Sequence, residues 1–357
     1  VLALERVLGM LRDANKPVFV IGSQTVLAVP EIESIANALD RLGVPVFLAG
    51  GARGLLGHQH PNQYRHKRTQ ALKQADFVLV AGFPLDFRLN YGQAINRKAK
   101  LVTVNLDEAA LSKNRRPTVG VHAHPGRFVQ QLSARFQAKP ERWADWHAEL
   151  QKAERAREQE IAEQAQAKVE GINPIDFFLQ LEPKLADDSV LVVDGGDFVA
   201  TASYILSPRR PLSWLDPGVF GTLGVGGGFA LAAAKVRPDA EVWLIYGDGS
   251  SAYSLAEFDT YVRHGLAPIA VVGNDGAWAQ IAREQVEMLG DACGTELRRT
   301  AYHTVAEGYG GVGLLLEDPA EIEATIDRAK ELARAGKPVL INVMIGATDF
   351  RKGSISM

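Results

Sequence analysis

Two polar side chains follow consecutive apolar runs in the second half of the chain and could together bind a metal ion. Asp248 comes directly after the run EVWLIYG, and Asn274 ends the next run, APIAVVGN. A carboxylate and an amide oxygen are hard donors of the kind that Mg²⁺ prefers, and Mg²⁺ usually keeps phosphate oxygens and water as further ligands. The two residues therefore indicate a site for Mg²⁺ and a phosphate group.

The residues around Asp248 fit a large anion. Gly247 and Gly249 carry no side chain, so the backbone can approach a phosphate closely. The amides of Gly249 and Ser250 begin an expected helix, where N–H groups and the helix dipole favour phosphate. Each polar residue alone has an ordinary alternative, since an Asp often caps a helix and an Asn often makes a turn. The pair, at this spacing and among these glycines, favours a metal-diphosphate site.

The elements that must position these residues are those of a parallel α/β sheet, in which ligands bind at the carboxyl ends of the strands. Apolar, β-branched runs end at glycines and alternate with helical stretches, a pattern typical of a parallel sheet covered on both faces. We therefore predict an α/β fold with two doubly wound parallel-sheet domains. The expected strands lie at 17–22, 45–50, 76–82 and 100–106 in the first domain, and at 190–196, 241–249, 267–275 and 338–346 in the second.

A segment rich in Ala, Glu, Gln, Lys and Arg separates the two blocks. It runs over 141–171 and ends at Gly171. Its apolar positions are too sparse for a sustained coiled-coil seam, so we predict a solvated helical connector. The predicted domains are then 1–140 and 172–357.

The composition excludes several classes of protein. The 357 residues carry a net charge of −3, which predicts neither a nucleic-acid partner nor an anionic membrane partner. No apolar run approaches the roughly 20 residues that span a bilayer. Cys293 is the single cysteine, which excludes an intrachain disulfide or a cysteine-built zinc site and fits a cytoplasmic protein. The chain starts without Met or a signal-peptide pattern, so we expect it to be part of a longer protein.

The spacing of the two polar residues resembles the signature of thiamine diphosphate enzymes. Asp248 stands between two glycines, and twenty-five residues separate it from Asn274. The resemblance implies that Asp248 and the Asn274 side chain bind Mg²⁺, that the carbonyl of Gly276 is the third protein ligand, and that Ala277 also contacts the cofactor. Asp275 stands where the family often has a second Asn, a change that does not touch the implied ligand atoms.

A second motif, FGTLGVGGGFALAAAK at 220–235, agrees with the first. It fails the dinucleotide fingerprint because Phe229 stands at the third glycine position, which disfavours an NAD-dependent dehydrogenase. It resembles the loop that grips the aminopyrimidine of thiamine diphosphate. The resemblance implies that the carbonyl of Gly221 and the backbone of Leu223 meet the pyrimidine. It also implies that the Leu223 side chain forces the cofactor into its reactive V shape.

A third motif, VVDGGDF at 192–198, is similar to the family's loop near the diphosphate. The usual polar pair is replaced by Asp197-Phe198, so the resemblance implies only a backbone role for Gly196 and Asp197.

Longer segments of the C-terminal half, including LDPGVFGTLG and GNDGAWAQIAREQ, look like the acetolactate-synthase-like branch, which is similar to 2-hydroxyacyl-CoA lyases. The resemblance implies that 1–140 is the middle domain and 172–357 the thiamine diphosphate-binding domain. It implies an enzyme that makes or breaks carbon–carbon bonds with thiamine diphosphate and Mg²⁺. We expect acetolactate-synthase-like chemistry on a 2-oxo acid. The alternatives are a 2-hydroxyacyl-CoA lyase or a non-catalytic cofactor-binding module.

The same resemblance has implications for the domain content and the oligomeric state of the protein. Family members have an additional pyrimidine-binding domain that carries the glutamate activating the cofactor. We expect that domain to be absent from this chain, and the chain alone to be inactive. We also expect a homodimer or homotetramer.

The middle domain binds FAD in acetolactate synthases and an ADP moiety in relatives that use CoA. Arg53, Arg88 and Asn90 are the polar residues that we would place near such a nucleotide, with an ordinary salt bridge as the alternative for each arginine. We assign no acid–base role to the histidines at 58, 60, 264 and 303.

Overall fold

The computed structural model describes residues 2–136 and 141–352, and it divides into two compact units. The first unit consists of Val1–Gln159 with Arg210–Leu212, and the second of Glu160–Arg209 with Ser213–Met357. Each unit is built around one parallel sheet, which confirms the predicted α/β class with two doubly wound domains.

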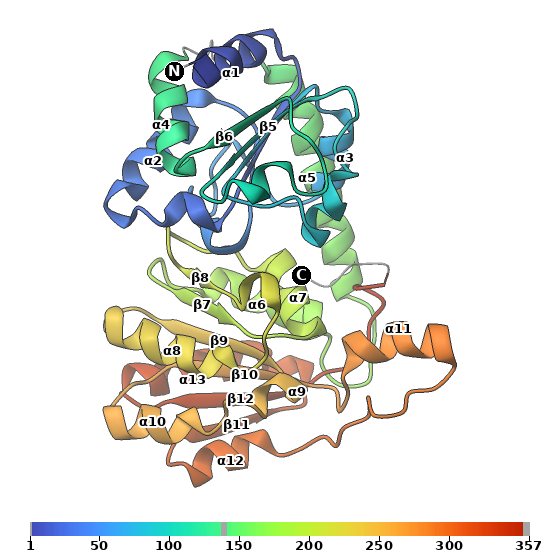
Figure 1. The fold of residues 1–357 in the computed structure, drawn as a ribbon. Coiled ribbons are helices and arrows are strands. Elements are labelled where there is room, and N and C mark those ends of the chain that lie inside the picture. The colour runs from blue at the N-terminus through green and yellow to red at the C-terminus, as the bar shows by residue number, and fades with distance from the viewer. Residues whose placement is uncertain (1, 137–140, 353–357) are drawn as a thin grey trace. The chain divides into compact units, whose positions relative to one another are not determined.

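Six parallel strands form the sheet in the described part of the first unit, in the order β3-β2-β1-β4-β5-β6. This order is typical of dinucleotide-binding folds, with its switch point between β1 and β4. The strands are β1 Pro17–Ile21, β2 Val46–Leu48, β3 Gln63–Tyr64, β4 Phe77–Ala81, β5 Lys100–Asn105 and β6 Val119–His122. The helices are α1 Leu2–Asp13, α2 Ile32–Leu42, α3 Arg68–Gln74 and α4 Pro125–Arg135 (Figure 1).

Helix α5 (Ala144–Ala165) lies within the segment 141–171 that is predicted to be a helical connector. Its beginning is not solvated, because Trp146 is 2% exposed and donates a hydrogen bond from Nε1 to the carbonyl of Pro17 at 3.0 Å. The buried aromatic residue fixes this part of α5 on the first core. The domain boundaries at 140 and 171 stay predictions.

Six parallel strands also form the sheet in the described part of the second unit, in the order β11-β12-β10-β9-β7-β8. The strands are β7 Val190–Val193, β8 Trp214–Leu215, β9 Val242–Gly247, β10 Ile269–Asn274, β11 Val312–Leu316 and β12 Val339–Met344. The helices are α6 Pro174–Leu181, α7 Asp197–Ile205, α8 Val225–Val236, α9 Asp248–Ser251, α10 Glu257–His264, α11 Ala279–Leu289, α12 Tyr302–Gly308 and α13 Ile322–Arg334.

Helices cover both faces of the second sheet (Figure 1). Alternate residues of a strand point to opposite faces, so β9 sends Trp243 to one core and Leu244 to the other. One core holds residues of α6, α7 and α13, and the other holds residues of α8, α10 and α12. Burial on both faces explains why these strands are continuous apolar runs in the sequence.

The four strands that sequence patterns do not predict are β3, β6, β8 and β11. All four lie at the edges of the two sheets, and the eight predicted strands fill the centres. Edge strands here are short or partly exposed: β3 and β8 have two residues each, and most of β11 is not buried. They therefore lack the long apolar run by which a central strand is recognised.

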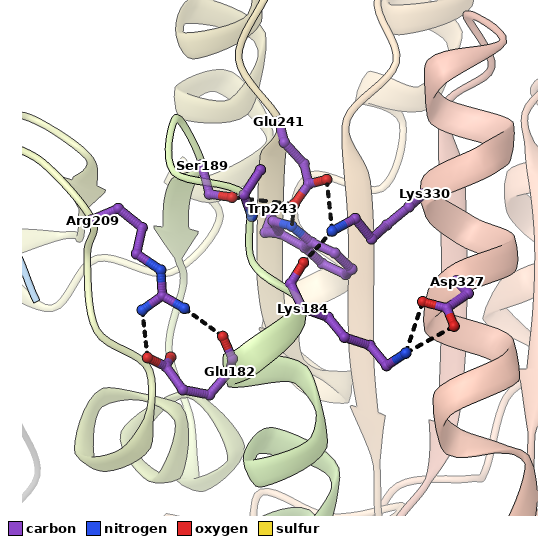
Figure 2. Close-up of polar contacts among 9 residues, drawn as sticks. Glu182, Lys184, Ser189, Arg209, Glu241, Trp243, Asp327 and Lys330 are labelled. Atoms are coloured by element: carbon purple, nitrogen blue, oxygen red, sulfur yellow. Dashed lines mark hydrogen bonds and ion pairs between the residues drawn. The ribbon is translucent and has the colours of Figure 1, made fainter.

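An ion-pair network supports the amino-terminal edge of the second sheet (Figure 2). Glu241, just before β9, accepts hydrogen bonds at Oε1 from Trp243 Nε1 at 2.7 Å and from Ser189 Oγ at 3.1 Å. Its Oε2 pairs with Lys330 Nζ at 3.2 Å, and Lys330 also donates to the carbonyl of Lys184. The network ties α13 to the start of two central strands, at the edge opposite the predicted site.

Candidate functional site

The predicted site residues of the second unit meet at the carboxyl edge of its sheet. Strands β7, β9 and β10 are parallel neighbours, so the loops that follow them lie side by side. The amide of Gly247 donates to the carbonyl of Gly195 at 3.2 Å, and Ser250 Oγ donates to the same oxygen at 3.1 Å. The amide of Gly276 donates to Asp248 Oδ2 at 2.8 Å. Hydrogen bonds thus join three successive strand ends into one site.

Asp248 is the residue on which this site is centred. Its side chain is buried, with Oδ1 accepting from the amide of Gly249 at 2.7 Å and Oδ2 accepting from Gly276. Burial raises the pKa of the carboxyl group, while these backbone donors act in the opposite direction. Since an ionised carboxylate offers about four lone-pair directions, both oxygens can still bind a cation.

Asn274 is fully buried at the end of β10. Its Nδ2 donates to the carbonyl of Thr300 at 2.9 Å and to Asn342 Oδ1 at 3.1 Å. Its Oδ1 is also buried but finds no hydrogen-bond partner among the residues that the structure describes. An unsatisfied buried acceptor costs about 1–3 kcal/mol, a cost that a bound cation would remove. The orphaned oxygen therefore fits the donor set of a Mg²⁺ site.

The loop after β10 holds the other implied ligand, the carbonyl of Gly276. This oxygen accepts a hydrogen bond from the amide of Leu297 at 2.7 Å, which leaves one of its two lone pairs for a metal. Gly276 has a φ of +72°, where a side chain would be strained. Ala277 follows, and its amide donates to Asp275 Oδ1 at 3.1 Å.

Acidic groups accumulate around this loop. Burial and then the charge of Asp248 raise the pKa of Asp275 to about 7, and Asp197 adds to the effect. Asp197 is itself paired with Arg283, whose Nη2 lies 3.1 Å from Oδ1. A divalent cation bound here would offset the repulsion among these carboxylates. The electrostatics of the loop thus agree with the ligand set.

Gly249 and Ser250, which are predicted to hold the diphosphate, already make contacts within the protein. Helix α9 is a single turn, and the amide of Gly249 is already bonded to Asp248. A Cβ placed on Gly249 would lie 2.6 Å from the ring of Trp278, so the indole rests directly on this backbone. Ser250 Oγ donates to the carbonyls of Gly195 and Gly247. The diphosphate role of Gly249 and Ser250 stays a prediction.

Leu223 lies in the loop before α8, and its position depends on Asp194, a residue that sequence reasoning missed. Asp194 is fully buried after β7 and accepts hydrogen bonds from the amides of Gly224 and Gly226, the nearest at 3.0 and 2.9 Å. It thereby ties the glycine-rich loop to the sheet. A Cβ on Gly195 would lie 2.0 Å from Leu223 Cδ2, so this side chain packs on the loop after β7. Its place directly after the apolar run VLVV is the sequence feature that could have identified Asp194 as a site residue.

The other predicted residues of this unit lie around the site. Gly196 precedes α7 with a φ of 109°, and Asp197 begins that helix. Gly221 is exposed with a φ of 59°. Of the histidines, His303 is connected to the site, because its Nδ1 lies 3.2 Å from Asn342 Nδ2. Asn342, Thr300 and Trp278 were not singled out by the sequence analysis.

Arg53, Arg88 and Asn90 belong to the first unit. Arg88 is bound to Asp86, with Nη2 and Oδ2 2.6 Å apart, and its guanidinium lies over the Phe83 ring at 4.1 Å from the centroid. Asn90 has a φ of 47° within the turn that follows β4. Arg88 thus forms a local ion pair, and the nucleotide role of these three residues stays a prediction.

The fold and the site together define a two-unit α/β protein whose second unit holds a buried carboxylate and an unpaired amide oxygen at the carboxyl edge of its sheet. Two family models identify it further. Residues 4–132 match the central domain of thiamine pyrophosphate enzymes, and residues 194–343 match their C-terminal TPP-binding domain. The chain belongs to the thiamine pyrophosphate enzymes and carries these two domains.

Individual relatives narrow the comparison. The chain is 47% identical to 2-hydroxyacyl-CoA lyase 2 of Danio rerio and 45% identical to that of Homo sapiens, over 99% of its own length. It spans 58% and 57% of those two proteins. It is 33% identical to the acetolactate synthase large subunit of Mycobacterium tuberculosis, over 96% of its length and 61% of that protein. These identities support the alternative, a 2-hydroxyacyl-CoA lyase, better than the expected acetolactate-synthase-like enzyme.

A solved structure also resembles the chain. It is a thiamine diphosphate-dependent 4-hydroxybenzoylformate decarboxylase from Rhodococcus jostii RHA1, with a TM-score of 0.77 and 19% identity over 97% of this chain and 64% of that one. At this identity the likeness concerns the fold alone. Within the described ranges, no helix is both long and apolar enough to cross a membrane.

Proposed function

We propose that this chain is the central and cofactor-binding part of a 2-hydroxyacyl-CoA lyase that uses thiamine diphosphate and Mg²⁺. The observation that carries the proposal is the orphaned Oδ1 of Asn274, buried at the same edge of the sheet as the carboxylate of Asp248. The choice of a lyase is supported by the higher identity to lyases, 47% against 33% for an acetolactate synthase.

The residues of the second unit have distinct roles in this proposal. Asp248, Asn274 Oδ1 and the carbonyl of Gly276 would hold Mg²⁺, and the half-buried Leu223 would contact the cofactor rings. Thiamine diphosphate supplies, when bound, an electron sink for cleavage of a carbon–carbon bond. The chain contributes binding, orientation and neutralisation of the diphosphate charge through the metal. Its apolar side chains exclude water.

The first unit would bind the nucleotide part of the substrate. Its strand order places a switch point between β1 and β4, where folds of this kind bind nucleotides. We propose an ADP moiety, as a CoA substrate carries, in preference to FAD. Calorimetric titration with ADP and with FAD would test this; tight FAD binding without ADP binding would contradict it.

The decisive assay compares two substrates on the full-length gene product. With thiamine diphosphate and Mg²⁺, a 2-hydroxyacyl-CoA should be cleaved between its thioester carbon and its hydroxyl-bearing carbon, giving formyl-CoA and an aldehyde that chromatography can measure. Pyruvate should be consumed much more slowly. The alternative function, acetolactate synthesis, is favoured by the 33% identical relatives, and rapid formation of acetolactate from pyruvate would establish it instead.

Assembly and location remain proposals. We propose a homodimer or homotetramer, which light scattering would test. We also propose a cytoplasmic location, which cell fractionation would test.

A further inference from the structure

Asn342 is a buried polar residue in a central strand, and the proposed cofactor contacts do not use it. It is 1% exposed in β12, which pairs with β10 so that Asn342 stands opposite Val272. Because side chains repeat every two residues along a strand, Asn274 and Val272 share one face of the sheet. Asn342 therefore lies diagonally behind Asn274, on the face that packs against α12.

The hydrogen bonds between these residues allow one orientation of the Asn274 amide. The carbonyl of Thr300 can only accept, and it lies 2.9 Å from Asn274 Nδ2 and 3.1 Å from Asn342 Nδ2. Both amides must therefore present their NH₂ groups to it. Asn342 Oδ1 then accepts the second proton of Asn274 Nδ2 at 3.1 Å. His303 Nδ1 lies 3.2 Å from Asn342 Nδ2 and orients it further.

A rotated Asn274 would be strongly disfavoured. Its Oδ1 would face two acceptors, the Thr300 carbonyl and Asn342 Oδ1, and its NH₂ group would lose both partners. In the observed orientation, Oδ1 is the buried atom without a partner among the described residues. Both side-chain N–H groups of Asn274 thus have hydrogen-bond partners, and its Oδ1 is left to accept from a ligand.

We propose that Asn342 is a positioning residue that, with the Thr300 carbonyl, holds Asn274 with Oδ1 directed at the metal. The proposal rests on the metal site proposed above. Residues that orient a metal ligand in this way typically account for 10–100-fold in metal affinity. A merely structural role for Asn342 would change the stability of the fold and leave metal affinity as it is.

The test is calorimetric titration of Mg²⁺ into the full-length protein at saturating thiamine diphosphate. Asn342→Leu and Asn342→Ser both remove the amide oxygen Oδ1 that accepts from Asn274 Nδ2, and each should raise the Kd for Mg²⁺ by about 10- to 100-fold. Because Ser is shorter and polar, Asn342→Ser provides the measurement if Asn342→Leu does not fold.

Asn173→Ser is the matched control. Asn173 is also buried in this unit, and its Nδ2 donates to the carbonyls of Gln164, Ala165 and Ala167. This variant should lower the Tm and leave the Kd for Mg²⁺ unchanged. If Asn342→Ser lowers the Tm but binds Mg²⁺ like the wild type, the positioning role is overturned. If the wild type itself binds no Mg²⁺ with thiamine diphosphate, the metal site proposed above is overturned first.

Discussion

The carboxylate of Asp248 joins two strand ends, because its oxygens accept from the amides of Gly249 and Gly276. The pairing of this residue with Asn274 could be predicted from spacing, since both follow apolar runs. The contacts that orient them could not, because Asn342 and Thr300 stand 68 and 26 residues from Asn274 and carry no local pattern. Asp194 could have been predicted as a site residue, because it is an acid directly after an apolar strand.

Asp248→Asn tests the metal site with little change of shape. The variant keeps an oxygen but loses the charge, so the affinity for Mg²⁺ with thiamine diphosphate should fall about 100-fold, or about 2.7 kcal/mol. Calorimetry measures this directly. Asp259→Asn, at an exposed carboxylate paired with Arg263 on α10, is the control and should bind normally. Undiminished binding by Asp248→Asn would refute the assignment.

Gly195→Ala tests the contact between Leu223 and the loop after β7. The new Cβ would lie 2.0 Å from Leu223 Cδ2, so the side chain must move, at a cost of about 1–3 kcal/mol of unfolding free energy. Removing the obstruction in Gly195→Ala/Leu223→Ala should make the effect of the first substitution smaller. Denaturant unfolding measures both.

Gly228→Ala serves as the control for that experiment. A Cβ at this position in α8 meets no atom within 4 Å, and an alanine there should stabilise the helix by up to about 1 kcal/mol. Equal midpoints for Gly195→Ala and the wild type would show that Leu223 is not held as described.

At the scale of elements, the sequence predicts the strands that are buried on both faces of a sheet. Strands β1 and β4 have every residue buried and appear as unbroken apolar runs, whereas the edge strands have exposed positions or only two residues. The ion pair at the amino-terminal end of β9 was not predicted from the sequence. There the Glu241–Lys330 pair joins α13 to the sheet through residues 89 positions apart (Figure 2).

Lys330→Met should destabilise the second unit by about 2–4 kcal/mol, because it leaves the Glu241 carboxylate, only 12% exposed, without its counter-charge. Lys330→Met/Glu241→Gln should recover part of this loss. Lys184→Met breaks a more exposed pair with Asp327 and should cost less than about 1 kcal/mol. Chemical denaturation measures all three, and equal costs for the two single variants would contradict the role of burial.

At the scale of the molecule, the two units have separate cores and should respond differently to acid. In the first unit, burial and nearby cations, beginning with Arg65, lower the pKa of His66 to about 3. The unfolded chain takes up this proton near the usual pKa of about 6.5, whereas the folded chain does not. The free energy of unfolding that this pKa difference contributes is therefore fully present above about pH 6.5, and it is lost as the pH falls towards 3.

The loss should reach at most about 1.4 kcal/mol per pH unit from this residue. Hydrogen exchange of amides in β1, followed between pH 7 and 4 and corrected for the intrinsic rate, would reveal it. His66→Gln should make the dependence in β1 shallower. An unchanged slope in that variant would show that His66 is not the source.

The contact between Trp278 and Gly249 gives the protein an optical reporter of its own. The indole covers the backbone where the diphosphate is proposed to bind, so a ligand arriving there must change the surroundings of this fluorophore. Emission should therefore respond to thiamine diphosphate with Mg²⁺ without any attached dye. Trp278→Phe should silence the response while the other four of the five tryptophans still emit. A persistent signal in that variant would trace it to another indole.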